Sequence, residues 1–295
     1  MASPIHSQAW WNGKLVAASD IQLSPFQTGL LTGWGLFSTL RIYDGVPFAL
    51  EAHWQRLRRD GHRLHVELDE LWDEAQAGFA AVVAANAIGD APLNAVARIY
   101  LIRNHGGLLD VPGRRATDLL IITRDLRSWG ASAALRVQPH GRDSQAPLAG
   151  TKTLTWAHNL VLVEEANAQG FDDLILLNER GEVAECTAAN IFIAGRDGLA
   201  TPPISSGALP GVSRQVLLES GPRHGLKIEE RALTEQDLYR ADEVFITSST
   251  REVQPVARIN DTKIALGAIA RRVEEIFQKE IAAYVGPRRV AKAMA

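Results

Sequence analysis

Lysine is scarce in this chain, and one lysine stands in a setting unlike the others. The 295 residues contain six lysines against 25 arginines. Lys152 lies in the segment 150–156, after a glycine and among hydroxyl-bearing and apolar residues. Partial desolvation there would lower the pKa of its amine, which could then act as a nucleophile or Schiff-base partner. A surface lysine near the start of a helix is the plainer alternative.

An acidic residue further along the chain is the second candidate. Glu185 follows the turn at Arg180-Gly181 and precedes a predicted strand over 191–194. A carboxylate in this position can be a solvated strand end. It can also keep the ring nitrogen of an electron-sink cofactor protonated.

Three further features favour the binding of an anion such as phosphate. Val212 and Ser213 follow Gly211 at the predicted start of a helix, where backbone amides and a hydroxyl can bind an anion. Residues 247–250, Thr-Ser-Ser-Thr, offer a second group of amides and hydroxyls at a strand end. Arg56 could clamp a phosphate with two parallel hydrogen bonds. Taken alone, each residue has a plainer explanation: Ser213 as the N-cap of a helix, and Arg56 as a surface charge on a helix.

The elements that must position these residues divide the sequence into two parts. Residues 1–125 predict a small α+β domain. Its hairpins turn at Asn12-Gly13 and Asp44-Gly45. Its helices are expected over 51–64 and 68–87, and its later strands over 95–103 and 118–123.

Residues 126–134 read as a connector, and residues 135–295 as a larger mixed α/β domain. Its expected helices span 156–169, 212–224 and 266–284, before a frayed basic tail over 286–295. Its expected strands span 135–139, 174–177, 190–194, 198–201, 227–231 and 243–247. The fold class expected for the whole chain is therefore α/β.

Composition excludes several classes of protein. Hydrophobic residues make up 46% and charged residues 22%, and the net charge is −3 with a pI near 6.3. These values argue against a disordered chain and against a nucleic-acid partner. No membrane span, secretory signal or disulfide framework is expected, since Cys186 is the single cysteine. We therefore expect a cytoplasmic protein. We also expect no metal site, because the pair His62 and His65 lacks a third ligand.

The candidate residues together resemble the fold-type IV pyridoxal-phosphate enzymes. That group contains branched-chain aminotransferases, D-amino acid aminotransferases and aminodeoxychorismate lyases, and the resemblance runs from about Trp11 to Phe277. Its motifs occur in the order of the family. They are His53-x-x-Arg56-Leu57, Lys152, Glu185-x-x-x-x-Asn190, Leu209-Pro-Gly-Val-Ser-Arg214, and Thr247-Ser-Ser-Thr-Arg-Glu252 with Pro255.

The resemblance implies a role for each cofactor-binding residue. Lys152 would hold pyridoxal 5'-phosphate as an internal aldimine and later move a proton on the substrate. Glu185 would pair with the pyridine nitrogen. The phosphate would be held by Arg56, Val212, Ser213 and Ser249.

The resemblance also implies substrate-binding residues and a dimer. Ser249 and Thr250 would face the substrate carboxylate, Phe37 and Arg98 would face the substrate, and Leu108 and Leu109 would form apolar walls. The loop 105–111 would reach the site of the partner subunit in a homodimer.

Three functions follow as hypotheses. The first is transfer of an amino group from a small or medium apolar, branched-chain-like amino acid to a 2-oxo acid. Segment 205–214 resembles the branched-chain enzymes, whereas Ser38-Thr39 and Glu185–Asn190 resemble the lyases. The second is therefore an aminodeoxychorismate lyase, which forms 4-aminobenzoate and pyruvate. The third is a non-catalytic phosphate-binding protein.

Overall fold

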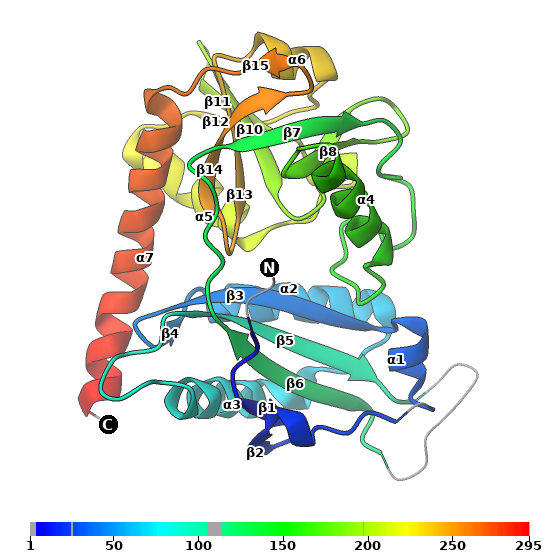
Figure 1. Cartoon of the computed structure of the whole chain (residues 1–295), viewed down its shortest axis with the longest axis vertical. Helices are drawn as coiled ribbons and strands as arrows, with labels where there is room; N and C mark the ends of the chain where they lie inside the picture. The colour runs from blue at the N-terminus through cyan, green and yellow to red at the C-terminus, as the bar shows by residue number, and fades with distance from the viewer. Residues whose placement is uncertain (1–3, 25, 106–113, 197, 295) are drawn as a thin grey trace. The chain divides into compact units, whose positions relative to one another are not determined.

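The chain forms two compact units, which Figure 1 shows in a computed structural model that describes residues 4–24, 26–105, 114–196 and 198–294. Unit 1 comprises Met1–Arg127, Lys152–Trp156 and Ala283–Ala295. Unit 2 comprises Ser128–Thr151 and Ala157–Ala282. Lys152 thus belongs to the unit built mainly from N-terminal residues, although its place in the sequence falls in the second part.

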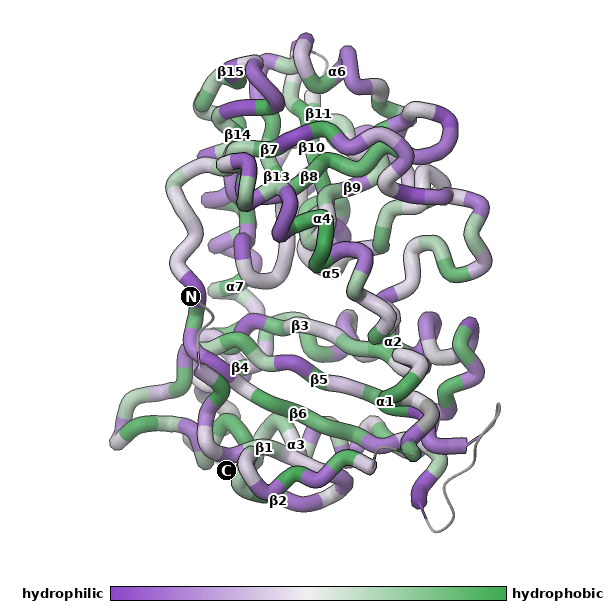
Figure 2. Tube along the Cα trace, turned by 45° about the vertical axis from the view of Figure 1, so that its right-hand side comes forward, coloured by the Kyte–Doolittle hydropathy of each residue, from purple (hydrophilic) through white to green (hydrophobic). Residues whose placement is uncertain are grey.

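Unit 1 is built on a six-stranded sheet with the order β2-β1-β6-β5-β3-β4, in which every pair is antiparallel. Its strands are β1 (Gln8–Trp11), β2 (Lys14–Ala17), β3 (Gly35–Tyr43), β4 (Val46–Pro47), β5 (Ala95–Arg103) and β6 (Thr117–Arg124). Figure 2 shows hydrophobic stretches in β3, β5 and β6, interrupted by hydrophilic residues. Such stretches supply the side chains that one face of the sheet buries.

The two hairpins predicted in this unit are confirmed. Asn12 and Gly13 have φ values of 48° and 86° between β1 and β2, and Asp44 and Gly45 have values of 48° and 76° between β3 and β4. A two-residue turn with two positive φ angles matches the twist of the flanking strands, which explains the Asn-Gly and Asp-Gly pairs.

Two long helices cover the core face of this sheet. The helical elements of unit 1 before its last segment are η1 (Ala18–Asp20), α1 (Thr28–Thr32), α2 (Leu50–Leu64), η2 (Asp69–Leu71) and α3 (Trp72–Ala85). Helix α2 confirms the predicted helix, whereas the one expected over 68–87 begins as the separate 3-10 turn η2. Trp54 and Leu57 of α2 and Phe79 of α3 share one buried cluster with β3, β5 and β6.

Gly78 lets α3 approach the sheet closely. A Cβ atom at this position would lie 2.7 Å from Trp10 Cδ1 and 2.8 Å from Ile121 Cδ1. A helix-interior glycine costs about 1 kcal/mol relative to alanine, so its presence here is explained by the close packing of α3 against β1 and β6.

Unit 2 contains a mixed sheet of nine strands with the order β12-β11-β10-β13-β14-β7-β8-β9, and β15 pairs with β14. The strands are β7 (Ala133–Gln138), β8 (Asp173–Leu177), β9 (Val183–Cys186), β10 (Asn190–Gly195), β11 (Gly198–Thr201), β12 (Ile228–Glu230), β13 (Glu243–Ser248), β14 (Glu252–Ile259) and β15 (Thr262–Lys263). The pairs β7–β8, β7–β14 and β11–β12 are parallel, and the other pairs are antiparallel. Strands β9, β14 and β15 were not predicted from the sequence.

The helices of unit 2 differ from prediction mainly at their ends. They are α4 (Ala157–Ala168), η3 (Ile204–Ser206), α5 (Val212–Ser220), η4 (Gly221–His224), α6 (Glu235–Arg240) and α7 (Ala268–Met294), which continues into unit 1. The helix expected over 212–224 becomes 3-10 at Gly221-Pro222, because proline has no backbone N–H to donate. Helix α6, which was not predicted, begins with a capping box formed by Thr234 and Asp237.

The expectation of a frayed tail was wrong. Helix α7 runs to Met294 and contains Pro287. Within unit 1 the helix is held by contacts with residues that lie far away in the sequence. The Tyr284 hydroxyl accepts a hydrogen bond from the Leu50 N–H at 3.2 Å, and Arg289 pairs with Asp44 at 3.2 Å. In the part of the chain that the structure describes, no helix combines the length and apolar character needed to cross a membrane.

The expected α/β class is confirmed. Unit 1 is an antiparallel sheet with helices on its core face, and unit 2 is a mixed sheet with helices between its strands. Each unit has its own hydrophobic cluster.

The core of unit 1 makes a testable stability prediction. Phe79 is 1% exposed, and Phe79→Ala should lower the free energy of unfolding by about 3–5 kcal/mol through lost burial and a residual cavity. Gln76→Ala, on the exposed side of α3, should change it by less than about 0.5 kcal/mol. Urea denaturation measures both, and equal effects of the two substitutions would contradict the assignment of the core.

Candidate functional site

Lys152 is fixed to unit 1 through its own backbone. Its N–H donates to the buried Asp60 carboxylate at 3.0 Å, and its carbonyl accepts from the Phe37 N–H at 3.2 Å. Thr153 forms a bridge with Leu36, and the Leu154 N–H donates to the Gly35 carbonyl at 2.9 Å. The segment 152–154 therefore pairs with the first residues of β3, whereas the short β4 pairs with its last residues.

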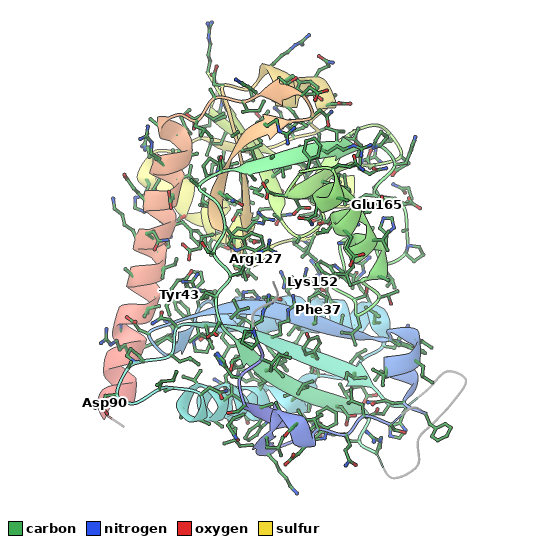
Figure 3. The ribbon with its side chains drawn as sticks, viewed as in Figure 1. Phe37, Tyr43, Asp90, Arg127, Lys152 and Glu165 are labelled. Carbon is green, nitrogen blue, oxygen red and sulfur yellow. The ribbon has the colours of Figure 1, made fainter. Side chains whose placement is uncertain are left out.

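The Lys152 side chain lies against aromatic rings. Its Nζ is 4.8 Å from the Phe37 ring centroid and 5.2 Å from that of Trp156. Phe37 is 4% exposed, meets Trp156 edge-on at 5.7 Å and stacks on Tyr100 at 6.2 Å. Figure 3 labels Phe37 and Lys152 beside each other at β3. The structure thus brings together two residues that the sequence proposed for one site.

Arg56 is a buried residue of α2 and not a surface charge. It is 9% exposed, and its Nη2 donates to the Ser38 hydroxyl at 2.8 Å. Ser38 Oγ also lies 2.7 Å from His53 Nδ1. The motif His53-x-x-Arg56 places both residues on one face of α2 because residues three apart are neighbours on a helix.

His53 is neutral in this environment. Complete burial lowers its pKa well below the usual 6.5, and the charges of Arg56 and Lys152 lower it further. A neutral imidazole can accept a hydrogen bond from the Ser38 hydroxyl at Nδ1, while Ser38 Oγ accepts a hydrogen bond from Arg56. This chain of hydrogen bonds fixes the Arg56 guanidinium.

Arg98 lies on β5 beside Phe37. Its guanidinium carbon is 5.7 Å from the Phe37 ring centroid, and its Nη1 lies 3.4 Å from the Tyr100 hydroxyl. The structure therefore brings Lys152, Phe37 and Arg98 together in unit 1. Arg56 belongs to the same unit and influences His53 together with Lys152.

Glu185 lies on β9 of unit 2 and is 7% exposed. Its Oε1 accepts from Arg142 Nε at 3.1 Å, and its Oε2 accepts from the Leu209 N–H at 3.0 Å. Each carboxylate oxygen can accept two hydrogen bonds. The carboxylate thus has capacity for a further donor, such as a protonated ring nitrogen.

The start of α5 is tied to the same part of unit 2. The Asn190 amide donates to the Leu209 carbonyl at 2.8 Å. A Cβ at Gly211 would collide with Asn190 Oδ1, so glycine is required immediately before the helix. Val212 and Ser213 are buried in the first turn, and the N-cap residue Gly211 has no side chain that could cap it. Its first backbone N–H groups, which lack intrahelical partners, suit an anion.

Ser249 and Thr250 lie in the turn between β13 and β14. Thr247 at the end of β13 pairs with Asn190 of β10, and α5 packs against β13. Within the described residues, the buried Thr247 Oγ1 has no hydrogen-bond partner. Unit 2 thus collects Glu185, the start of α5 and the hydroxyl-rich turn.

The single cysteine, Cys186, is a buried residue of β9. Cys186 is fully buried, and burial first, then the charge of Asp173, raises the pKa of its thiol well above the usual value. A low-pKa nucleophile is therefore ruled out at this position.

Two substrate residues expected from the sequence cannot be placed. Leu108 and Leu109 lie outside the described residues, as does most of the loop 105–111. The contact of this loop with a partner subunit stays a prediction. Within the described ranges, no group of three or more His, Cys, Asp or Glu side chains could hold a metal ion.

Sequence reasoning missed two residues that position the candidates. Asp60, which binds the Lys152 N–H, lies on the same face of α2 as His53 and Arg56. That helical spacing was a signal. No such signal identified Arg142, which binds Glu185, because 43 residues separate the two and only the folded sheet brings them together.

The buried His53 predicts how stability depends on pH. Its pKa is lower in the folded chain than in the unfolded one, so its contribution is present above about pH 6.5 and is lost as the pH falls. Between pH 6.5 and 5.5 the wild type should lose about 1 kcal/mol more of unfolding free energy than His53→Gln. Chemical denaturation at both pH values tests this. A His158→Gln control, at an exposed position, should follow the wild type, and parallel profiles of His53→Gln and wild type would refute the prediction.

Comparison with known proteins bears on these arrangements directly. The model of the family "amino-transferase class IV" matches residues 35–259, a range that contains both Lys152 and Glu185. A relative from Methanocaldococcus jannaschii, provisionally named a branched-chain-amino-acid aminotransferase, is 30% identical over 274 residues. The alignment covers 90% of this chain and 94% of the relative.

Solved structures show the same fold. The branched-chain amino acid aminotransferase of Escherichia coli is similar with a TM-score of 0.84 and 24% identity, covering 94% of this chain and 95% of the other. A hypothetical aminotransferase of Mycobacterium tuberculosis in its PLP-bound form gives a TM-score of 0.83 and 23% identity, covering 94% and 99%. The resemblance noted in the sequence is confirmed, and this chain belongs to the class IV aminotransferases.

Proposed function

We propose that the protein transfers an amino group from a small or medium apolar, branched-chain-like amino acid to a 2-oxo acid, with pyridoxal 5'-phosphate as cofactor. Membership of the class IV aminotransferases supports the reaction class. The observation that carries the cofactor assignment is Glu185, a buried carboxylate held by Arg142 and the Leu209 N–H with capacity for one more donor. A pyridine ring kept protonated by such a group is an electron sink.

The donor set of this chain fits that cofactor. Lys152 supplies a primary amine, Glu185 supplies an acceptor for a ring N–H, and the uncapped start of α5 supplies amides for a phosphate. When bound, the cofactor would supply an aldehyde for the substrate amine and would delocalise the electron pair left at the substrate Cα.

The residues of the chain divide the remaining work. Lys152 would bind the cofactor covalently and then move the proton to and from the substrate Cα, as a positioned general acid and base. Arg56, Val212, Ser213 and Ser249 would hold the phosphate, the valine through its N–H. Ser249 and Thr250 would offer N–H groups to the substrate carboxylate.

Lyase chemistry on the same fold is the second candidate. Ser38 supports it, because the sequence Phe37-Ser38-Thr39 resembles the aminodeoxychorismate lyases. In the structure the Ser38 hydroxyl is committed to Arg56 and His53. This arrangement is compatible with either reaction, so product analysis must separate the two.

Absorbance spectra of the protein with pyridoxal phosphate test the proposed reaction. Branched-chain amino acids should convert the aldehyde form of the cofactor to its amine form, and a 2-oxo acid should reverse the change. Pyruvate released from aminodeoxychorismate without an amino acceptor would support the lyase instead. A protein that takes up no cofactor would contradict both functions.

Lys152 can be identified chemically. Borohydride should fix a pyridoxyl group on Lys152, found by peptide mass mapping, and Lys152→Ala should lose both the label and at least about a thousandfold of turnover. Lys279→Ala, at an exposed position of α7, should retain both. Labelling of any other lysine would disprove the assignment.

A further inference from the structure

Arg251 is a buried arginine in the turn between β13 and β14 that carries Ser249 and Thr250. It is 8% exposed, and its backbone N–H donates to the Ser248 hydroxyl at 3.2 Å. Ser249 and Thr250 are the residues whose N–H groups would face the substrate carboxylate. Because a buried charge is costly unless it is paired, the partners of Arg251 show what holds this turn in place.

The turn ends at a residue in an unfavourable backbone conformation. Ser248 pairs with Glu252 across the hairpin, and Glu252 has a φ of 57°. Residues with a Cβ atom adopt such left-handed angles only where neighbouring contacts hold them. The Glu252 carboxylate accepts a hydrogen bond from Gln278 of α7. The conformation of the turn therefore depends on side chains that anchor it to other segments of unit 2.

The Arg251 guanidinium anchors the turn to β8. Its Nη2 lies 3.5 Å from Asp173 Oδ2, and Asp173 is 1% exposed. The other oxygen of this carboxylate accepts from the Thr187 N–H at 3.1 Å. Thr187 lies two residues after Glu185 in the sequence. The ion pair thus links the turn to the segment that carries the candidate partner of the pyridine nitrogen.

The same guanidinium also lies against the connector between the two parts of the sequence. Arg251 Cζ is 3.8 Å from the centroid of the Trp129 ring, a favourable cation–π contact. Arg251 Nη1 donates to Gln254 Oε1 at 2.5 Å, and Gln254 Nε2 donates to the Gly130 carbonyl at 2.9 Å. One side chain of the turn therefore contacts both β8 and the connector.

We propose that Arg251 is a positioning residue for the substrate carboxylate. By bridging β8 and the connector, it holds the turn in the conformation that presents the N–H groups of Ser249 and Thr250. Hydrogen bonds weaken steeply when their angles are distorted, so a small shift of the turn reduces carboxylate binding. This inference rests on the proposed function, because it deepens the role given to Ser249 and Thr250.

Calorimetric titration of two unreactive ligands tests the proposal. 4-Methylpentanoate and 4-methylpentanamide share one apolar chain, but only the former carries a charged carboxylate. At saturating pyridoxal phosphate, the wild type should bind the acid at least about tenfold more tightly than the amide. Arg251→Met should weaken binding of the acid by about tenfold or more and change binding of the amide by less than about threefold.

A matched control lies at the other end of β14. The Arg258 guanidinium carbon is 4.2 Å from the Phe171 ring centroid, so Arg258→Met removes a similar arginine–aromatic contact away from the turn. This variant should keep the preference for the acid. Trp129→Phe retains a ring against Arg251 and should also keep it, whereas Trp129→Leu should lose part of it.

A second variant separates positioning from folding. Arg251→Met leaves the Asp173 carboxylate buried without its cation, which destabilises the protein. Adding Asp173→Asn removes that charge, so the double variant should melt closer to the wild type by circular dichroism but still lack the preference for the acid. If the single variant does not fold, the double variant decides, and if neither folds, the two Trp129 variants decide. Wild-type preference in the folded variants would overturn the proposal.

Turnover supplies an independent readout. In Arg251→Met the KM of the amino acid donor should rise about tenfold while kcat falls less than about threefold, because the carboxylate is bound equally in the ground and transition states. A variant in which kcat falls and KM does not change would contradict a positioning role at the carboxylate.

Three further outcomes distinguish this inference from the proposed function. A protein that transfers no amino group, but loses its preference for the acid in Arg251→Met, would contradict the function and leave the positioning role. An active protein in which Arg251→Met keeps the preference would contradict the positioning role alone. Weaker binding of pyridoxal phosphate with an unchanged preference would show that Arg251 serves the phosphate, and the proposal would be wrong.

Discussion

The placement of Lys152 depends on two backbone hydrogen bonds to residues far away in sequence. Its N–H reaches the Asp60 carboxylate of α2, and its carbonyl receives the Phe37 N–H of β3. Asp60 is fully buried and is also bound by Arg59 Nε at 2.9 Å. A buried carboxylate without such donors would be costly, so the fold of α2 and the position of the lysine are coupled.

The buried charges of unit 2 follow the same logic. Glu185 is satisfied by Arg142, and Arg142 is in turn bound to Asn159, whose amide donates to the Thr187 carbonyl at 2.6 Å. Asp173 accepts from the Thr187 N–H and lies 3.5 Å from Arg251. Burial raises the pKa of Asp173, and Arg251 opposes that change. Removing one partner would leave a buried charge unpaired, so these networks hold the loops that carry the candidate residues.

Phe37 links the candidate amine of unit 1 to the neighbouring strand. Phe37 is in contact with the Lys152 amine and with the Arg98 guanidinium, and the quadrupole of its ring attracts both cations. The face therefore combines an aromatic ring with two cationic groups.

The sequence by itself determined the residue types of the site, the hairpins and most element positions, because these follow from local turn chemistry and hydrophobic spacing. Helix α2 is the best case, since one stretch encodes its length and the shared face of His53, Arg56 and Asp60. Tertiary structure alone decided the partners: that Arg142 binds Glu185 and that Lys152 extends β3. Strand order and register set these pairings between distant segments, and no local pattern encodes register.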